Sequence, residues 1–423
     1  MRSSWPVRSY YRQMGRRHLF VFAPLGILAV ALVASSPAHA VGNSYQWSGG
    51  SSVGFDTSDP TNWSGAAGPG SGDDIYIPAG TDMNVDGGPL TVRRLMVDVG
   101  QDFGISGQPM TITGEIAVTQ PAGYATEIEN DLTLDDVDFV FVQDTNTLFV
   151  SGPMTVVGDA QLGGEGDIVV SGQVAGGSVT VFGDGDLVLR GGGSLAGISV
   201  QSGTVHAGSV ITSDVAATGG VLSGGTPSNT GGSEQSVGAV SLGSSAVLSP
   251  GPTPGGDDEG LFATTGSLSA APGSSVVLGL GAASDAVAVA GTADITGSTL
   301  IVHPRPGLQA GDRFVPITAG AIVGEFADES GTPLTGGSTF VQSGQRWRIT
   351  YGTTDIAVEN LGPVPTAGSA PSGAGALAET GPAGAGTLAA LGMTFTALGA
   401  ALLVATRLVP SFSPRRPPRS SRR

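Results

Sequence analysis

Three acidic residues that lie close together in the sequence, Asp135, Asp136 and Asp138, form the cluster best suited to acid–base chemistry. Paired carboxylates on one face can act as general acid and as nucleophile or base in the hydrolysis of glycosidic bonds. In an extended strand the side chains alternate between two faces, so Asp136 and Asp138 would share a face and Asp135 would not. The alternative interpretation, which the acidity of the whole chain favours, is a set of solvated acids at a strand edge.

Histidine and serine patterns typical of hydrolases are not found. His206 and His303 are the only histidines after residue 40, and neither lies in a His-x-His or His-Glu-x-x-His frame. His206 follows Val205 and His303 precedes Pro304, so both are predicted to be surface or turn residues. No serine lies in a Gly-x-Ser-x-Gly pattern with the strand and helix that a nucleophile elbow requires.

Three glycine-rich acidic segments suggest turns or weak cation sites. The segments 163–167 and 183–186 resemble the calcium nonapeptide Gly-Gly-x-Gly-x-Asp, but the aspartate comes one residue early and no tandem array follows. Turn formation is therefore the favoured interpretation. The segment 255–260 could bind calcium weakly through its acidic side chains. No cofactor is predicted other than such a weak structural calcium.

The composition excludes several classes of chemistry. The chain has 423 residues, 70 glycines and no cysteine, and its 18 basic residues are all arginine. Without cysteine there can be no disulfide, no cysteine-ligated metal and no cysteine nucleophile. Arginine without lysine, together with abundant Ala, Gly and Val, indicates a GC-rich genome.

The charges are divided sharply between the ends and the middle of the chain. Residues 1–40 hold five arginines and residues 381–423 hold six, with no acid in either segment. Residues 41–380 hold seven arginines and all 35 acids, which gives this body a net charge of −28. Such a body is expected to repel nucleic acid and anionic lipid headgroups and to attract cations.

The first 40 residues read as a secretory signal. A basic segment with five arginines precedes the apolar run Leu19–Val33, and the small residues Ala38 and Ala40 frame a cleavage site. The mature chain is predicted to start near Val41. The pair Arg16-Arg17 loosely matches a twin-arginine signal, so the export route stays open.

The C-terminus has three parts in order. The pentapeptide Leu377, Ala378, Glu379, Thr380 and Gly381 comes first. The uncharged run 387–406 follows, and its 20 residues are what a helix needs to cross a bilayer core of roughly 30 Å. The basic tail 407–423 would then stay on the cytoplasmic side.

This arrangement resembles the cell-wall sorting signal of Gram-positive surface proteins, in the Leu-Ala-x-Thr-Gly form read by class E sortases of high-GC actinobacteria. The resemblance implies that a sortase cysteine attacks the carbonyl of Thr380, that the bond to Gly381 breaks, and that a peptidoglycan amine resolves the acyl-enzyme. Sortase and peptidoglycan would be the partners, and the membrane-spanning state would be transient. The alternative is an ordinary C-terminal membrane anchor with a chance Thr-Gly.

The body between the two ends shows short β-rich runs separated by Gly, Asn or Asp, and no helical periodicity. Regular short strands with turn signals indicate a sandwich, a barrel or a solenoid, and the very short runs of one composition favour the solenoid, although no strict repeat is visible. The runs expected to form strands are Leu90–Val99, Thr111–Thr113, Ile116–Val118, Leu132–Leu134, Val137–Val142, Leu148–Val150, Met154–Val157, Ile168–Val170, Val179–Phe182, Leu187–Leu189 and Ile198–Val200.

The two ends of the body carry the aromatic residues that a stacked core needs at its termini. The opening, with Trp47, Phe55 and Trp63 before the strand-like Asp74–Ile77, resembles the first coil of bacterial secreted β-solenoids. The segments 183–197 and 284–302, and the closing run from Gly311 to Val358, resemble autotransporter-passenger β-helices. Residues 219–262 could be thin coils with a protruding loop, or they could be a linker that divides the body in two. Ser249-Pro250-Gly251 matches an element that is frequent in passenger β-helices, which favours one continuous solenoid.

Together these features predict an all-β chain whose body, residues 41–361, is a right-handed parallel β-helix (β-solenoid) with aromatic end caps. A signal helix precedes it, and a Pro/Ala/Gly/Ser-rich linker (362–376), the sorting signal (377–423) and its transmembrane helix follow it. The expected function is that of a secreted, sortase-anchored surface protein, structural or adhesive rather than catalytic, that could contact a glycan or protein ligand. The alternative is an extracellular polysaccharide-active enzyme. It would be a hydrolase rather than a lyase, because β-helical pectate lyases use a basic catalytic residue and no arginine lies near Asp135.

Overall fold

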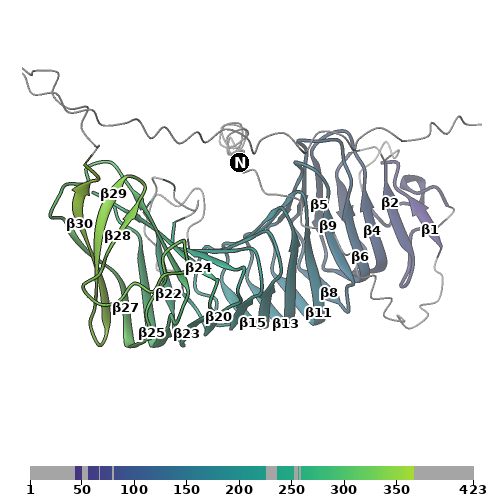
Figure 1. Cartoon of the computed structure of the whole chain (residues 1–423). Coiled ribbons are helices and arrows are strands. Elements are labelled where there is room, and N and C mark those ends of the chain that lie inside the picture. The colour runs from purple at the N-terminus through teal and green to yellow at the C-terminus, as the bar shows by residue number, and fades with distance from the viewer. Residues whose placement is uncertain are drawn as a thin grey trace, which may run out of the picture. The chain divides into compact units, whose positions relative to one another are not determined.

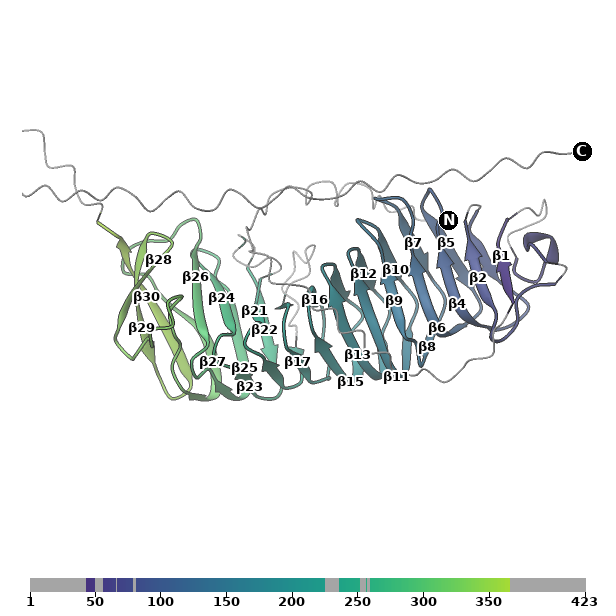
Figure 2. The same ribbon diagram turned by 45° about the vertical axis from the view of Figure 1, so that its right-hand side comes forward.

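The computed structural model describes residues 43–49, 56–65, 67–78, 81–224, 236–251, 256 and 259–365. These residues form a β-solenoid of about ten turns, and their only helical element is the short 3₁₀ helix η3 (Pro60–Asn62). Parallel strands stack one behind another along the solenoid (Figures 1 and 2). The predicted all-β solenoid is therefore confirmed.

Several predictions fall outside the described residues. They are the signal helix, Phe55, the linker after Pro365, the sorting signal and the apolar run 387–406. Within the described part of the chain, no helix has the length and apolar character required to span a membrane.

One side of every coil belongs to an eleven-stranded parallel sheet. Its strands are β3 (Met83–Val85), β5 (Phe103–Gly107), β7 (Ala125–Ile128), β10 (Thr147–Val150), β12 (Asp167–Val170), β14 (Asp186–Leu189), β16 (Thr204–Ala207), β18 (Val221–Ser223), β21 (Val247–Ser249), β24 (Ser275–Leu280) and β26 (Thr299–Pro304).

The remaining strands form a nineteen-stranded sheet that wraps around the rest of each coil. They are β1 (Ser44–Gln46), β2 (Asp74–Ile77), β4 (Leu90–Val97), β6 (Met110–Val118), β8 (Leu132–Asp135), β9 (Phe139–Val142), β11 (Met154–Gly164), β13 (Val174–Gly183), β15 (Gly193–Val200), β17 (Val215–Ala217), β19 (Ser236–Val237), β20 (Val240–Leu242), β22 (Leu261–Thr264), β23 (Leu268–Ala270), β25 (Ala286–Asp294), β27 (Arg313–Val323), β28 (Thr339–Gln342), β29 (Gln345–Tyr351) and β30 (Asp355–Pro363).

The long strands of the second sheet turn a corner in their middle. The pairing of β4 with β6 shifts register after Val92, where Gly114 lies between two well-paired halves. The same shift interrupts the pairing of β11 with β13 after Val156. In these coils one long strand therefore forms two sides and a strand of the eleven-stranded sheet forms the third, whereas β8 and β9 form the same two sides as separate strands. For this reason the separately predicted runs Thr111–Thr113 and Ile116–Val118 are one strand, β6, and Met154–Val157 is the first half of β11.

The core is built from columns of aliphatic side chains, one from each coil. In the eleven-stranded sheet the register stacks Ile168, Leu187, Val205, Leu222 and Leu248 in order, and all five are buried. Because strand side chains alternate, each short apolar run supplies its core residues at every second position. Burial of such columns is the main stabilising term of the solenoid.

Coil length changes along the stack. Hydrogen bonds between neighbouring coils join residues 22 apart at Gln108 and Asn130, and 18 apart at Val200 and Thr218. The spacing then rises to 27 between Thr218 and Ser245 and to 28 between Val237 and Thr265. The parallel pairing of β18 with β21 and of β17 with β20 carries both sheets across residues 225–235. The strands on the two sides of 219–262 thus belong to one stack.

Aromatic residues cover both ends of the core, as predicted. Trp47 and Trp63 are buried, with ring centroids 4.9 Å apart, next to β2. At the other end β27, β30, β29 and β28 form an antiparallel sheet, and its Trp347 is fully buried. Large aromatic surfaces stabilise the terminal coils, which would otherwise expose apolar side chains.

Candidate functional site

A surface hollow lies on the nineteen-stranded sheet, across β13, β15, β17, β20 and β23. Its volume is about 480 Å³. The hydroxyls of Ser199, Ser241 and Ser269 lie in the same outward column, with Ala216 between them. The hollow therefore offers hydroxyl groups over a mostly apolar floor. The residues that line it are Ser178, Gly197, Ile198, Ser199, Asp214, Val215, Ala216, Ala239, Val240, Ser241, Ser267 and Ser269.

The acidic cluster Asp135, Asp136 and Asp138 lies at a corner of the coil, outside this hollow. Asp135 is the last residue of β8, and Asp136 has a left-handed backbone with φ of 51°. The backbone amide of Asp138 donates to the carbonyl of Gly114 in the preceding coil. The expectation that Asp136 and Asp138 share one face of a strand is wrong, because both lie between β8 and β9 (Phe139–Val142), where the chain bends. Asp136 occupies a conformation that aspartate tolerates better than most residues, which explains its presence without invoking catalysis.

A second pair of acids was missed as a pair by sequence reasoning. Asp167 and Asp186 begin equivalent strands, β12 and β14, and the amide of Asp186 donates to Oδ1 of Asp167 at 3.1 Å. Nε2 of the buried His206 lies 3.4 Å from Oδ2 of Asp186. His206 was predicted to lie in a turn or at the surface, which is wrong, because the strand β16 buries it. His303 lies in the strand β26 and not in a turn, and its half-buried side chain agrees with the predicted surface position.

The pKa values of Asp167 and Asp186 are shifted in opposite directions. Burial, and then the charge of Asp186, raise the pKa of Asp167 above its ordinary value. Burial acts to raise the pKa of Asp186 as well, but the hydrogen bond and charge of His206 outweigh it and lower that pKa. Neighbouring carboxyls separated in this way could exchange a proton with a ligand. The sequence signal was the repeat Gly-Glu-Gly-Asp-Ile and Gly-Asp-Gly-Asp-Leu at 164–168 and 183–187.

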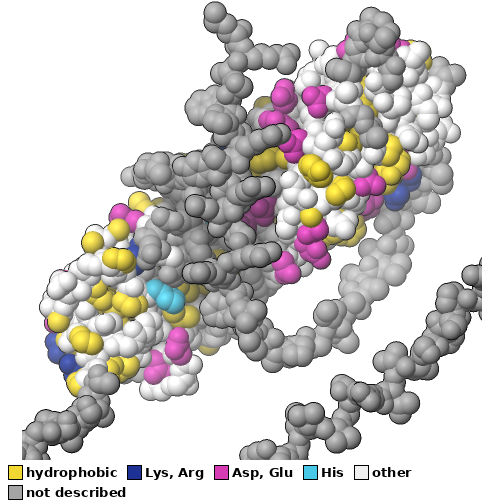
Figure 3. Space-filling model, turned by 90° about the horizontal axis from the view of Figure 1, so that it is seen from above, with side chains coloured by type: hydrophobic (Ala, Val, Ile, Leu, Met, Phe, Trp, Pro, Cys, Tyr) yellow, Lys and Arg dark blue, Asp and Glu magenta, His cyan; other side chains and the backbone are white. Residues whose placement is uncertain are grey.

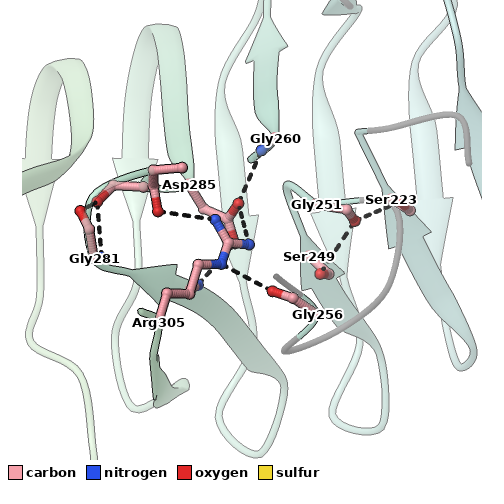
Figure 4. A network of polar contacts seen from close by, with 11 residues as sticks. Ser223, Ser249, Gly251, Gly256, Gly260, Gly281, Asp285 and Arg305 are labelled. Carbon is pink, nitrogen blue, oxygen red and sulfur yellow. Dashed lines mark hydrogen bonds and ion pairs between the residues drawn. The ribbon is translucent and has the colours of Figure 1, made fainter. Parts of the chain in front are cut away.

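In the segment that could bind calcium weakly, residues 255–260, the described Gly256 contacts a guanidinium. Nε of Arg305 donates to the carbonyl of Gly256 at 2.8 Å, and its Nη2 lies 2.9 Å from Oδ1 of Asp285 (Figure 4). Oδ1 of Asp285 also accepts from the amide of Gly260 at 2.9 Å, and Oδ2 accepts from Gly279 at 2.7 Å. The Gly256 carbonyl thus already has a cationic partner, which disfavours a metal ion beside it.

This ion pair belongs to a buried polar network. The side chains of Arg305 and Asp285 are 2% and 1% exposed. Nearby, the hydroxyls of Ser223 and Ser249 both donate to the carbonyl of Gly251. A Cβ at Gly279 would collide with the guanidinium of Arg305, so only glycine leaves room for it. The network ties the start of β22 to β24 and to the end of β26.

The residues that the structure describes contain neither a metal-binding cluster nor the predicted sorting and cleavage residues. In residues 43–365, as far as they are described, no three carboxylate or imidazole groups are placed to hold a metal ion together. The sorting residues Leu377, Ala378, Glu379, Thr380 and Gly381, and the cleavage residues Ala38, Ala40 and Val41, lie outside the described residues. Comparisons of the chain with family models, with curated proteins and with solved structures find no match.

Proposed function

We propose that this chain is a secreted surface protein, anchored to the cell wall by a class E sortase, whose acidic β-solenoid serves as a structural or adhesive stalk. The observation that carries the proposal is the position of the fold between the two predicted export and sorting signals. The strand β1 starts at Ser44, just after the predicted cleavage before Val41, and β30 ends at Pro363, where the Pro/Ala/Gly/Ser-rich segment begins. The folded body therefore fills the part of the chain that would be exported.

A solenoid of about ten turns suits a stalk. Neighbouring strands in a sheet are about 4.8 Å apart, so ten turns advance the chain by roughly 50 Å. We further propose that the coils are right-handed, because the right-handed twist of strands favours right-handed crossovers between parallel neighbours. The many exposed acids keep such a stalk soluble, and its stacked side chains could contact a glycan or protein.

The sorting step would proceed through Thr380. The run 387–406 would hold the chain in the membrane until the sortase cysteine attacks the Thr380 carbonyl and releases Gly381. Transfer to a peptidoglycan amine would leave the linker 362–376 between the wall and the solenoid. The basic tail would remain on the cytoplasmic side during this step.

Fractionation of the native host tests the anchoring. Wild type is expected in the muramidase-released fraction with Thr380 as its last residue, joined to a peptidoglycan peptide and identified by mass spectrometry. Thr380→Ala is expected to stay with the membrane, whereas Thr366→Ala, a matched change in the linker, is expected to behave as wild type. Recovery of the wild type in the membrane fraction with Arg423 at its end would refute the sorting step.

The polysaccharide hydrolase is the weaker proposal, because its two requirements lie on different sheets. The hollow that could hold a ligand lies on β13 to β23 of the nineteen-stranded sheet. The carboxyl pair with separated pKa values, Asp167 and Asp186, lies on β12 and β14 of the eleven-stranded sheet. A glycosidase needs its carboxylates beside the bound sugar.

A further inference from the structure

The exposed arginines of the body are concentrated at its C-terminal end. Four of the seven body arginines are exposed, and three of these four, Arg313, Arg346 and Arg348, lie on the antiparallel closing sheet. The fourth, Arg94, lies on β4 at the other end of the solenoid. In Figure 3 a group of dark blue side chains marks the end of the molecule at the lower left. The positive charge of an otherwise acidic body is therefore local.

The strand register brings the three arginines together. Arg313 of β27 and Arg348 of β29 are both paired with Glu359 of the intervening β30, so the three residues form one row across the sheet. Arg346 lies two residues from Arg348 on the same face of β29. Directly opposite residues in such a row have Cβ atoms only about 5 Å apart. We call Arg313, Arg346 and Arg348 the arginine face.

Glu359 cannot neutralise the arginine face. It lies 3.2 Å from Nη1 of Arg348, and both side chains remain partly exposed. One carboxylate lies among three guanidinium groups, and the carboxylate of the nearby Asp312 accepts a hydrogen bond from the amide of Gln309 at 2.6 Å. The cations therefore outnumber the acids here, and an exposed ion pair of this kind contributes little stability. Nη2 of Arg346 lies 3.4 Å from the carbonyl of Leu361, over the strand by which the chain leaves the solenoid.

Two acids of the closing segment, Asp355 and Glu325, lie at the opposite end of the same strands, whereas Asp312 and Glu359 lie near the arginines. Asp355 is paired with Thr318, near Tyr351 at the far end of β29. The hydroxyl of Tyr351 accepts from the amide of Phe326, which places the neighbouring Glu325 at that end too. Tyr351 follows Arg346 by five positions along β29, which corresponds to about 17 Å. The closing sheet is thus polarised, with its cationic end where the chain exits.

Exposed apolar residues adjoin the arginine face. Val341 of β28 is paired with Arg346 and is 62% exposed, and Val315, two residues after Arg313, is 41% exposed. A surface with separated guanidinium groups and small apolar patches can bind a flexible polymer that carries anionic groups on an apolar backbone.

We propose that the arginine face binds a phosphate-bearing polymer of the cell wall. Guanidinium forks bind phosphate oxygens in a bidentate manner, and three arginines on one face can each contact a phosphate of one polymer. The assignment to the wall rests on the proposed function, since sortase anchoring would place the chain exit, and hence the arginine face, nearest the wall. The acidic remainder of the solenoid would be repelled by the same polymer and would point outward.

Binding of long-chain inorganic polyphosphate to the predicted mature chain, residues 41–380, tests the proposal without requiring anchorage, because this chain lacks the eleven arginines of the two basic ends. Wild type is expected to bind with an affinity that falls as salt rises between about 50 and 200 mM. The triple variant R313Q/R346Q/R348Q is expected to lose affinity by roughly tenfold or more, because three charge-assisted contacts are removed. The triple lysine variant should retain part of the affinity, which separates charge from folding.

Arg94→Gln is the matched control, since Arg94 is also exposed and faces one acid, Glu115, at 3.5 Å. Its affinity for polyphosphate should equal that of the wild type. An equal loss in Arg94→Gln, or no loss in the triple variant, would overturn the proposal.

Binding to phosphatidylglycerol vesicles but not to polyphosphate would assign the surface to lipid instead. Self-association in sedimentation that the triple variant abolishes would assign it to a second copy. Failure of wall anchoring in the host would leave the binding result unaffected, so the two proposals fail separately.

Discussion

From β5 to β14, paired residues of neighbouring coils are 23 to 19 residues apart, whereas from β18 to β26 the separation reaches 28 residues. The two regions stack aliphatic columns in the same way, but they differ in what they bury beside them. In the first region the described buried polar side chains are neutral, namely Gln120, Thr126, Asn130 and Asn146. In the second region they include the ion pair of Asp285 and Arg305 together with several serines.

The difference indicates how a solenoid accommodates longer coils. Additional residues between strands increase the conformational entropy that must be lost, and they contribute no core side chain. The buried network around Arg305 holds Gly256 and Gly260 against β24 and β26, which fixes the path of the chain where the coil is longest. A short coil needs no such buried network, because its corners connect one strand directly to the next.

Breaking the ion pair is expected to have the largest effect. Asp285→Ala would leave the Arg305 guanidinium buried without its carboxylate, at a cost of roughly 3–5 kcal/mol. Hydrogen exchange should show loss of protection in β24 and β26, while β5 and β7 keep theirs, because a solenoid is stabilised mainly by contacts between adjacent coils. The matched control Glu115→Ala removes the exposed partner of Arg94 and should change stability by less than about 1 kcal/mol. Equal loss of protection in both regions would show that the network is not local.

Adding a side chain at a corner glycine of the first region, β5 to β14, is expected to destabilise the fold by a smaller amount. Gly176 has a φ of +107°, and a Cβ there would collide with the carbonyl oxygen of Val156 in the preceding coil. Gly176→Ala should destabilise the coils around β13 by about 1–3 kcal/mol, measured by the urea midpoint of β13 amide exchange. Gly123 has a similar φ of +91° but no heavy atom within 4 Å of such a Cβ. If Gly123→Ala costs as much, backbone strain rather than close approach of the coils sets the penalty.

The smallest expected effect is the loss of stability on acidification that comes from Asp186, the carboxyl beside His206. Because the folded pKa of Asp186 is lowered from 3.8, its ionised form stabilises the fold above that pH, and the contribution is lost as the pH falls through the folded pKa. Wild type should therefore melt at a higher temperature than Asp186→Asn at neutral pH, and the difference should shrink below about pH 4. Thr180→Val, a change on β13 whose strand neighbours Gln161 and Ser199 are uncharged, should show a difference that does not depend on pH in this way. A gap between Asp186→Asn and wild type that stays constant down to low pH would contradict the assignment.

Much of the fold could be predicted because it depends on local pattern. Short apolar runs with alternating burial, such as Ile168–Val170 and Leu187–Leu189, predict strands wherever they occur. The aromatic residues Trp47, Trp63 and Trp347 could be assigned to the ends because a stacked core must be covered there. The corners were missed, since β6 and β11 continue through glycine positions that a local pattern assigns to turns.

The sites were less predictable, because residues on different coils are brought together only by register. Asp135 to Asp138 are neighbours in sequence, yet a corner separates them, whereas Asp167 and Asp186 are 19 residues apart and bond directly. Nothing in the sequence near Arg305 shows that its partner is Asp285, 20 residues earlier.

The β-rich, cysteine-free, acidic character of the body and the spacing of its apolar runs can be predicted from the sequence, because they depend on residue type and on positions a few residues apart. Three features are seen only in the structure: which coils are long, which acid faces His206, and that Arg313 and Arg348 flank one glutamate. The physical reason is that a parallel stack relates residues by coil length, which varies from one turn to the next and is set by packing and by backbone hydrogen bonds between coils.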